Sequence, residues 1–236
     1  MIDVRPFNAL GTFSNEWLAA NYHFSFSGYQ ARDRMHWGAL RVWNDDAIQP
    51  KTGFSPHSHA DMEIITYVRE GAITHEDSMG NRGRTEAGDV QVMSAGAGVT
   101  HAEYNLEDGV TRLFQIWILP KVRGGKPYWG AAKFPKGDRA GKFVPLASGF
   151  ADDQAAGALP IRQDARVLGA TVKAGERTEY ALGGDRHAYL VVAKGEVTVN
   201  GARLGERDGA ALKDLPAITV EAHADAELVL VDAPSI

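Results

Sequence analysis

The chain has 236 residues, 44% of them apolar and 23% charged, which allows a sizeable core in one large domain or two small ones. Its net charge of −5, with Lys and Arg scattered along the chain, gives no electrostatic reason to expect direct nucleic-acid binding, which needs a basic face. The lack of cysteine excludes disulfides, thiolate metal sites and cysteine nucleophiles, and leaves His, Asp and Glu as possible metal ligands.

The first residues of the chain contain no apolar run behind a basic start, so no signal peptide is expected there. Apolar runs elsewhere are only a few residues long, far below the roughly 20 that a membrane-spanning helix requires. The absence of cysteine is also typical of proteins in a reducing compartment. We therefore expect a cytoplasmic protein without a membrane segment.

Most segments alternate apolar and polar residues, with turn residues about every 8–12 positions, which is typical of an all-β sandwich or barrel. One short helix is expected over residues 15–21, with Ser14 as its cap. Residues 197–204 are expected to form a hairpin, because Asn200-Gly201 suits the positive backbone angles of a type I′ turn. The other clear strand predictions cover residues 39–43, 62–68, 90–93, 112–119 and 189–192.

Residues 134–159 differ from the rest of the chain, because they are rich in Gly, Ala, Asp and Lys and show little periodicity. A similar order of strand, glycine turn, polar strand and glycine turn occurs on both sides of this region. Gly71 and Gly88 hold these turns in the first half, and Gly195 and Gly209 hold them in the second. We therefore predict an all-β duplicated fold of two antiparallel β-barrel lobes packed together. The predicted domains are residues 1–133 and 134–236, with the linker reaching to about residue 159.

Candidate metal ligands are concentrated in two short patterns, His57-Ser-His59 and His101-Ala-Glu103. Alternate side chains of a strand share one face and lie about 7 Å apart along the chain, so both members of each pair can turn toward one ion. Two such pairs on neighbouring strands give four nitrogen and oxygen donors. Such a set suits Fe, Mn, Ni, Cu or Zn better than Mg or Ca, which prefer all-oxygen shells.

The alternative for a single His-x-His pair is an exposed pair on the surface of a strand. The second pair, about 40 residues further on and also bounded by glycines, favours a metal site. Glu63 lies four residues after His59 and can share its face, so the spacing alone leaves both Glu63 and Glu103 open as the carboxylate ligand. His75 is expected on the polar face of a hairpin, and His23 as a packed or hydrogen-bonding residue. The remaining histidines, expected at the surface or in the core, are His36, His187 and His223.

The frame around these pairs resembles the two motifs of the cupin superfamily. Gly53, His57, His59, Glu63 and Gly71 follow the first motif, with a shortened leader and one extra residue before the last glycine. The second motif lacks its usual proline, and its matching residues are Gly88, Gly98, His101 and Asn105. Within the cupins the chain is similar to the pirin family, in its bacterial group that includes quercetin 2,3-dioxygenases. The segments that carry this likeness are Arg41–Asp46, His59–Glu63, Asp77–Asn81, Met93–Gly96, His101–Asn105 and Gln115–Ile118.

The resemblance implies a bicupin fold of two jelly-roll lobes with one divalent metal ion in the first lobe. It assigns the ligands to His57, His59, His101 and Glu103, and it leaves Glu63 to orient a ligand histidine by a hydrogen bond. Direct ligation by Glu63 stays as the alternative. Fe is the expected metal, with Mn, Ni, Cu, Co and Zn as alternatives. The second lobe has no His-x-His or His-x-Glu pair, so no metal is expected there.

The resemblance also implies an activity, the oxidative ring cleavage of a flavonol such as quercetin by O2. In this interpretation Glu103 or Glu63 is the catalytic base that takes the flavonol hydroxyl proton. From the sequence alone, five apolar residues can either line a cavity beside the metal or fill the core, namely Phe54, Met62, Met93, Phe114 and Trp117.

The competing hypothesis is a metal-binding regulatory protein that modulates a protein partner, with flavonol cleavage an incidental activity. Both hypotheses share the metal centre and differ in whether the chain has a small-molecule substrate of its own. A monomer is expected in either case, because two fused lobes can cover each other's apolar faces.

Overall fold

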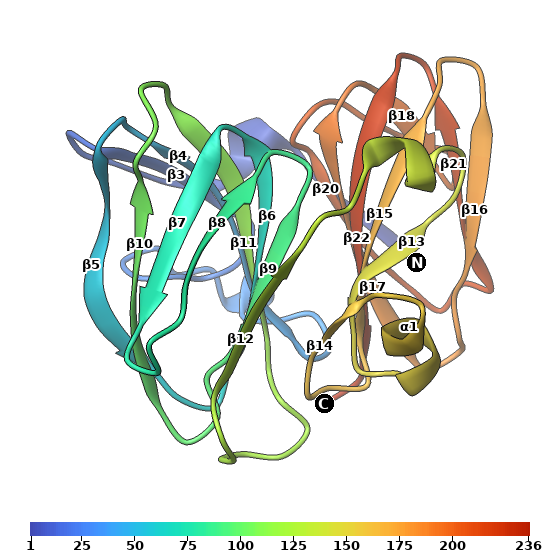
Figure 1. Cartoon of the computed structure of the whole chain (residues 1–236). Coiled ribbons are helices and arrows are strands. Elements are labelled where there is room, and N and C mark those ends of the chain that lie inside the picture. Colours follow the sequence, from blue (N-terminus) through green and yellow to red (C-terminus); the bar gives the residue numbers. More distant parts are fainter.

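The computed structural model describes all 236 residues and shows two lobes of β-structure lying side by side (Figure 1). Each lobe packs a seven-stranded sheet against a four-stranded sheet. Nearly all strand pairs are antiparallel, and the sheets are open at their edges rather than closed into barrels. The all-β prediction with two antiparallel lobes is confirmed, with each lobe a two-sheet sandwich of the jelly-roll kind.

In the first lobe the strand order of the large sheet is β12-β9-β6-β11-β4-β3-β2, and that of the small sheet is β5-β10-β7-β8. The large sheet contains β2 (Gly11–Ser14), β3 (Leu18–Tyr22), β4 (Leu40–Ile48), β6 (Glu63–Glu70), β9 (Val90–Ser94), β11 (Thr111–Ile118) and β12 (Tyr128–Ala132). The small sheet contains β5 (Thr52–His59), β7 (Ala72–Asp77), β8 (Arg82–Glu86) and β10 (Val99–Asn105).

In the second lobe the strand order of the large sheet is β1-β20-β17-β22-β15-β13-β14, and that of the small sheet is β16-β21-β18-β19. The large sheet contains β1 (Ile2–Arg5), β13 (Val144–Ser148), β14 (Leu159–Pro160), β15 (Arg166–Val172), β17 (Arg186–Lys194), β20 (Gly209–Lys213) and β22 (Ala226–Pro234). The small sheet contains β16 (Arg177–Ala181), β18 (Val197–Val199), β19 (Ala202–Leu204) and β21 (Ala217–Ala222).

Helices are few and short. The one α-helix is α1 (Ala151–Ala155), and the 3₁₀ turns are η1 (Phe7–Ala9), η2 (Arg32–Arg34) and η3 (Lys136–Arg139). None of these helices is long and apolar enough to cross a membrane.

The helix predicted over residues 15–21 is wrong, because Leu18–Tyr22 form strand β3 between β2 and β4. The side-chain oxygen of Asn15 accepts hydrogen bonds from the backbone N–H groups of Trp17 and Leu18, which makes a turn there instead of a helix. The predicted hairpin is confirmed as β18 and β19, and both Asn200 and Gly201 have positive φ angles.

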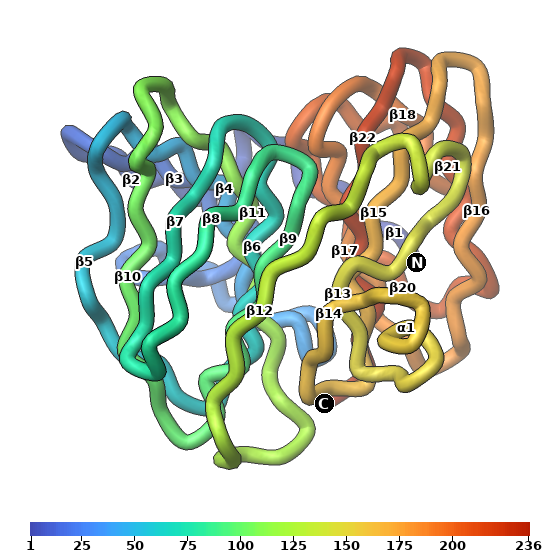
Figure 2. Tube along the Cα trace, in the orientation of Figure 1, coloured from blue at the N-terminus to red at the C-terminus, as the bar shows by residue number.

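The two lobes have the same sheet plan, since the middle strands of each sheet follow one another in corresponding order. This agreement confirms the duplication inferred from the glycine turns. One strand departs from the order of the chain. The N-terminal strand β1 lies at the edge of the large sheet of the second lobe, in the position that β12 occupies in the first lobe (Figure 2). β13, inside the region predicted as the crossing, also belongs to the second lobe, and the boundary at residues 133 and 134 stays a prediction.

The largest apolar cluster lies between the lobes and contains 24 buried residues, among them Trp43, Tyr67, Phe114 and Tyr189. A second cluster of 18 residues fills the interior of the second lobe. The interior of the first lobe has only two smaller clusters, of 7 and 4 residues. The space between those two is occupied by buried polar side chains, and the predicted site lies there.

Candidate metal centre

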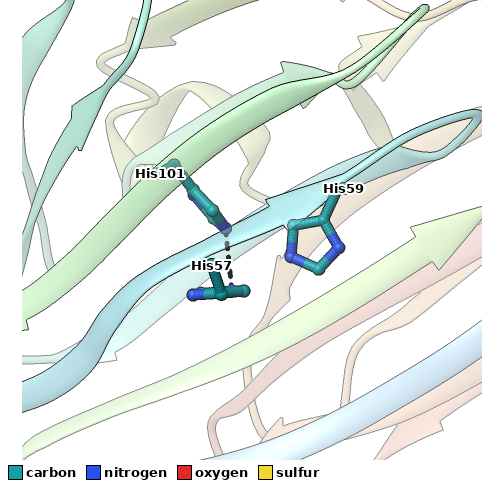
Figure 3. Close-up of side chains that lie close together, drawn as sticks. All are labelled: His57, His59 and His101. Carbon is teal, nitrogen blue, oxygen red and sulfur yellow. Dashed lines mark hydrogen bonds between the residues drawn. The ribbon is translucent and has the colours of Figure 1, made fainter.

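Three histidines of the small sheet in the first lobe converge on one point. His57 and His59 come from β5 and His101 from β10, and His57 and His101 are direct partners across the two strands. The Nε2 atoms of His57 and His101 lie 3.1 Å apart, and the ring centre of His59 lies 4.8 Å from that of His57. Figure 3 shows the three rings pointing toward one another. Their nitrogen donors lie within 4.8 Å of one another, close enough for one metal ion.

The protonation of these rings suits a cation. His57 Nδ1 lies 2.8 Å from the carbonyl oxygen of Ser55, which can only accept, so Nδ1 carries a proton and Nε2 is the nitrogen that faces the cluster. Burial and the neighbouring His57 lower the pKa of His59 to about 4. Burial and the other histidines lower the pKa of His101 to about 3. Both rings are therefore neutral at pH 7, which is the form that binds metal.

Glu103 lies next to this cluster, two residues after His101 on β10. Its side chain is 2% exposed and accepts hydrogen bonds from the amides of Gln91, at 2.6 Å, and Gln115, at 2.8 Å. Burial raises the pKa of Glu103 to about 7, although these hydrogen bonds oppose the rise. A carboxylate oxygen of Glu103 and ring nitrogens of His75 and His101 all lie within 4.8 Å of one another. The cluster of His57, His59 and His101 does not include this oxygen. The structure thus brings together the three histidines and places Glu103 beside them through His101.

His75 is placed differently from the sequence prediction. It is 0% exposed, pairs with Glu103 across β7 and β10, and faces the interior of the first lobe instead of the polar side of a hairpin. The signal was present in the sequence, because Ile73, His75 and Asp77 occupy alternate positions of one strand. A strand that turns Ile73 into the core turns His75 the same way.

Glu63 does not take the place expected for it. Its carboxylate accepts hydrogen bonds from the hydroxyl of Ser94 and, at 3.1 Å, from the backbone N–H of Arg162 in the second lobe. It makes no hydrogen bond with a histidine, so the expected bond that would orient a ligand is absent. The reason is its face on β6: Glu63 lies on the same side as Ile65 and Tyr67, which pack between the lobes.

The other histidines lie away from the cluster. His23 is fully buried between the lobes, where its Nδ1 lies 2.8 Å from the hydroxyl of Tyr189, as expected for a packed, hydrogen-bonding residue. His36 and His223 are exposed, and His187 is half-buried against Trp37.

The five apolar residues expected either to line a cavity or to fill the core separate into two groups. Phe54 and Trp117 are partly exposed and lie beside the site, with the Trp117 ring 5.0 Å from that of His59. Phe26 meets Trp117 edge to face at 5.4 Å, and Trp17 meets Phe54 at 5.1 Å. These four rings form an aromatic rim around the histidines. Phe114 lies instead in the cluster between the lobes, and Met93 packs in the core with Met62 against it.

Comparison with known proteins agrees with this geometry. Residues 3–118 match the family model described as Pirin, and residues 147–233 match the quercetinase C-terminal cupin domain. A pirin-like protein of Caulobacter vibrioides is 67% identical over 99% of this chain and the whole of that protein. The chain belongs to the pirin family.

A sequence match and a crystal structure from Escherichia coli bear on the chemistry. A protein named quercetin 2,3-dioxygenase is 38% identical over the whole of both chains. A crystal structure of the pirin YhhW in complex with nickel(II) superimposes with a TM-score of 0.93 over the whole of both chains, at 36% identity. The bicupin resemblance inferred from the sequence is confirmed. Together with the histidine cluster, the nickel complex supports a divalent-metal site in the first lobe.

Proposed function

We propose that this pirin is a metal-dependent dioxygenase that cleaves the ring of a flavonol such as quercetin with O2. The observation that carries the proposal is the cluster of three histidines beside Glu103, with the aromatic rim next to it. The E. coli relative named quercetin 2,3-dioxygenase, aligned over the full chain, supports the same reaction class.

In the proposed centre His57, His59, His101 and Glu103 hold one divalent ion. Fe is the expected metal, and Mn, Ni, Cu, Co and Zn suit the same donors, because a nitrogen and oxygen shell accepts each of them. When bound, the ion supplies a Lewis acid that lowers the pKa of a coordinated hydroxyl. Four protein donors leave room for substrate oxygens on a five- or six-coordinate ion.

The residues around the centre divide the remaining tasks. Phe54 and Trp117 offer flat apolar faces on which the aromatic rings of a flavonol stack. Glu103 is the proposed base for the 3-hydroxyl proton, because its carboxylate lies next to His101 and so beside the position where the substrate hydroxyl would bind. Gln91 and Gln115 hold its carboxylate in place. Glu63, bonded to Ser94 and Arg162, is the weaker candidate for this role.

The test is to load the metal-free protein with Fe(II) or Ni(II) without oxygen, then add quercetin and O2 and follow quercetin loss and CO release. We expect stoichiometric CO from the wild type, and no turnover from His101→Ala with its fold retained by circular dichroism. A wild type that stays inert with every first-row metal would overturn the proposal. In that case the regulatory hypothesis, with a protein partner and no substrate, takes its place.

Three properties belong to the same proposal. The chain acts as a monomer, since the 24-residue cluster between the lobes already covers the inner faces of both large sheets. Its location is cytoplasmic, in keeping with the lack of cysteine. Residues 1–133 form the metal-binding domain, and residues 134–236 form a cupin-like domain that packs against it.

A further inference from the structure

We propose that His75 and Asp77 are positioning residues that fix the orientation and the proton of His101, so that its Nε2 atom faces the metal. Three contacts link these residues one after another to His57. Asp77 Oδ2 lies 3.0 Å from His75 Nε2, His75 Nδ1 lies 3.4 Å from His101 Nδ1, and His101 Nε2 lies 3.1 Å from His57 Nε2. This inference rests on the proposed metal centre and adds two residues to it.

The hydrogen-bond roles along this line follow from one requirement. If His101 binds metal through Nε2, its other nitrogen, Nδ1, carries the proton and donates it to His75 Nδ1. His75 must then carry its own proton on Nε2, where it donates to the carboxylate of Asp77, which can only accept. Every nitrogen of both rings has a defined role in this arrangement.

His75 is held firmly enough to act in this way. Its ring stacks on the indole of Trp129, with ring centres 4.9 Å apart and planes 9° from parallel. Gly83 lies against the indole, where a Cβ would meet the ring, so the glycine allows Trp129 to approach. The stack and the burial of His75 leave its ring no freedom to flip away from His101.

Asp77 is fixed from the opposite side. Its Oδ1 accepts hydrogen bonds from the backbone N–H groups of Met79, at 2.9 Å, and Asn81, at 3.1 Å. The side-chain amide of Asn81 also donates to Oδ2 at 2.9 Å. The turn after β7 thus anchors the carboxylate, and its Oδ2 remains directed at His75.

The structure also allows a different use of His75, as a metal ligand in its own right with His101 and Glu103. That site would require His101 to bind through Nδ1 and to carry its proton on Nε2, the nitrogen that faces His57. It would separate His101 from His57 and His59. We therefore favour the positioning role and treat ligation by His75 as an outcome that the test can return.

The first measurement is the affinity for Ni(II), determined by chelator competition without any substrate. His75→Phe keeps the ring stacked on Trp129 but removes the acceptor for His101, and we expect Ni(II) to bind about 10–100-fold more weakly. His75→Gln is the matched control, because its amide oxygen can accept the same proton, and its affinity is expected to stay closer to that of the wild type. Equal affinities in the wild type and His75→Phe would overturn the proposal.

The second measurement is the position of the protons, read by nitrogen-15 NMR of Zn(II)-loaded protein with labelled histidine. We expect His101 to be protonated on Nδ1 and His75 on Nε2, and the His75 signal to change in Asp77→Asn. A proton on His101 Nε2 would overturn the proposal and favour ligation by His75. Unfolding of each metal-free variant in urea serves as the control for folding.

The two measurements separate this inference from the proposed activity. Neither uses quercetin or O2, so a protein that binds Ni(II) and cleaves nothing still tests His75. A wild type that binds no Ni(II) would overturn both the metal centre and the positioning role.

Discussion

The two lobes share one sheet plan and differ in what fills it. The second lobe encloses a continuous apolar cluster of 18 buried residues. In the first lobe two small clusters, of 7 and 4 residues, are separated by buried His75, His101, Glu103, Gln91 and Gln115. In a duplicated fold, one lobe can therefore hold buried polar side chains in its interior. The other lobe and the interface between the lobes keep the apolar packing that stabilises the chain.

The difference is clearest in the small sheets, where β10 and β21 occupy the same place in the strand order. The buried positions of β10 include His101 and Glu103, whereas those of β21 are Ile218, Val220 and Ala222. The next strands of the two small sheets differ in the same way, because β7 buries His75 and β18 buries the apolar residues Val197 and Val199. A few inward positions thus decide which lobe has donors for a metal.

The interface between the lobes joins these two interiors. Its apolar cluster is edged by ion pairs that cross from one lobe to the other, such as Arg207 with buried Asp45. The buried hydroxyl of Tyr67 bonds Glu227 across the same interface. Because these contacts need both lobes, the first lobe gains stability from the second that its own divided interior does not supply.

The largest effect on Ni(II) affinity is expected when an inward histidine of the first lobe is replaced by an apolar residue like those at the inward positions of the second lobe. His101→Val should weaken Ni(II) binding at least about 100-fold, because it removes a ligand at the centre of the cluster. The metal-free protein should change in unfolding free energy by only about 1 kcal/mol, since a buried polar ring is exchanged for an apolar side chain. Calorimetric titration and urea unfolding measure the two quantities, and retained tight binding would contradict the assignment.

A core truncation in the second lobe should show the reverse pattern. Leu190→Ala, at a fully buried position of the 18-residue cluster, should lower the unfolding free energy by about 2–5 kcal/mol. The Ni(II) affinity of the folded protein should stay within about twofold of wild type, because this side chain lies outside the first lobe. A tenfold loss of affinity would show that the two interiors are coupled and would contradict their independence.

The interface should add an acid-sensitive contribution through His23. Burial, reinforced by nearby arginines, lowers its pKa to about 3, so the folded protein keeps it neutral where the unfolded chain protonates it near pH 6.5. Stability therefore falls as the pH drops below about 6.5, by up to about 1.4 kcal/mol for each pH unit from this one group. His23→Gln should remove that part of the slope in urea unfolding between pH 7 and pH 5. An unchanged slope would contradict the buried, neutral state of His23.

The smallest effect is expected from Glu63→Gln. The variant keeps one acceptor for the backbone N–H of Arg162, so we expect a stability loss of about 1 kcal/mol and nearly unchanged quercetin turnover. Glu103→Gln is the matched control, and it should lose most of its turnover. A large loss of turnover in Glu63→Gln at normal Ni(II) affinity would restore Glu63 as the catalytic base.

Much of the first lobe could be predicted from the sequence, because the alternation around His57, His59 and His101 places them on one face of two strands. The strand that holds Glu63 carries less information. Both faces of β6 are buried, so residues 63–68 show no alternation that tells the lobe interior from the interface. The face of Glu63 is settled by Arg162, 99 positions away in the second lobe.

His75 illustrates the opposite case, in which local information was sufficient. Its alternation with Ile73 and Asp77 indicated an inward face, yet the polar neighbours of the segment favoured a hairpin surface. The contact that gives His75 its significance, with His101 on β10, depends on strand pairing that spacing alone does not reveal.

We expect one metal ion in the first lobe and none in the second. An anomalous difference map from a crystal loaded with nickel, recorded at the nickel absorption edge, locates every bound ion. A single peak is expected, bounded by Nε2 of His57, His59 and His101, with the Glu103 carboxylate as the fourth donor. A peak elsewhere, or one coordinated by His75 in place of His57, would contradict this expectation.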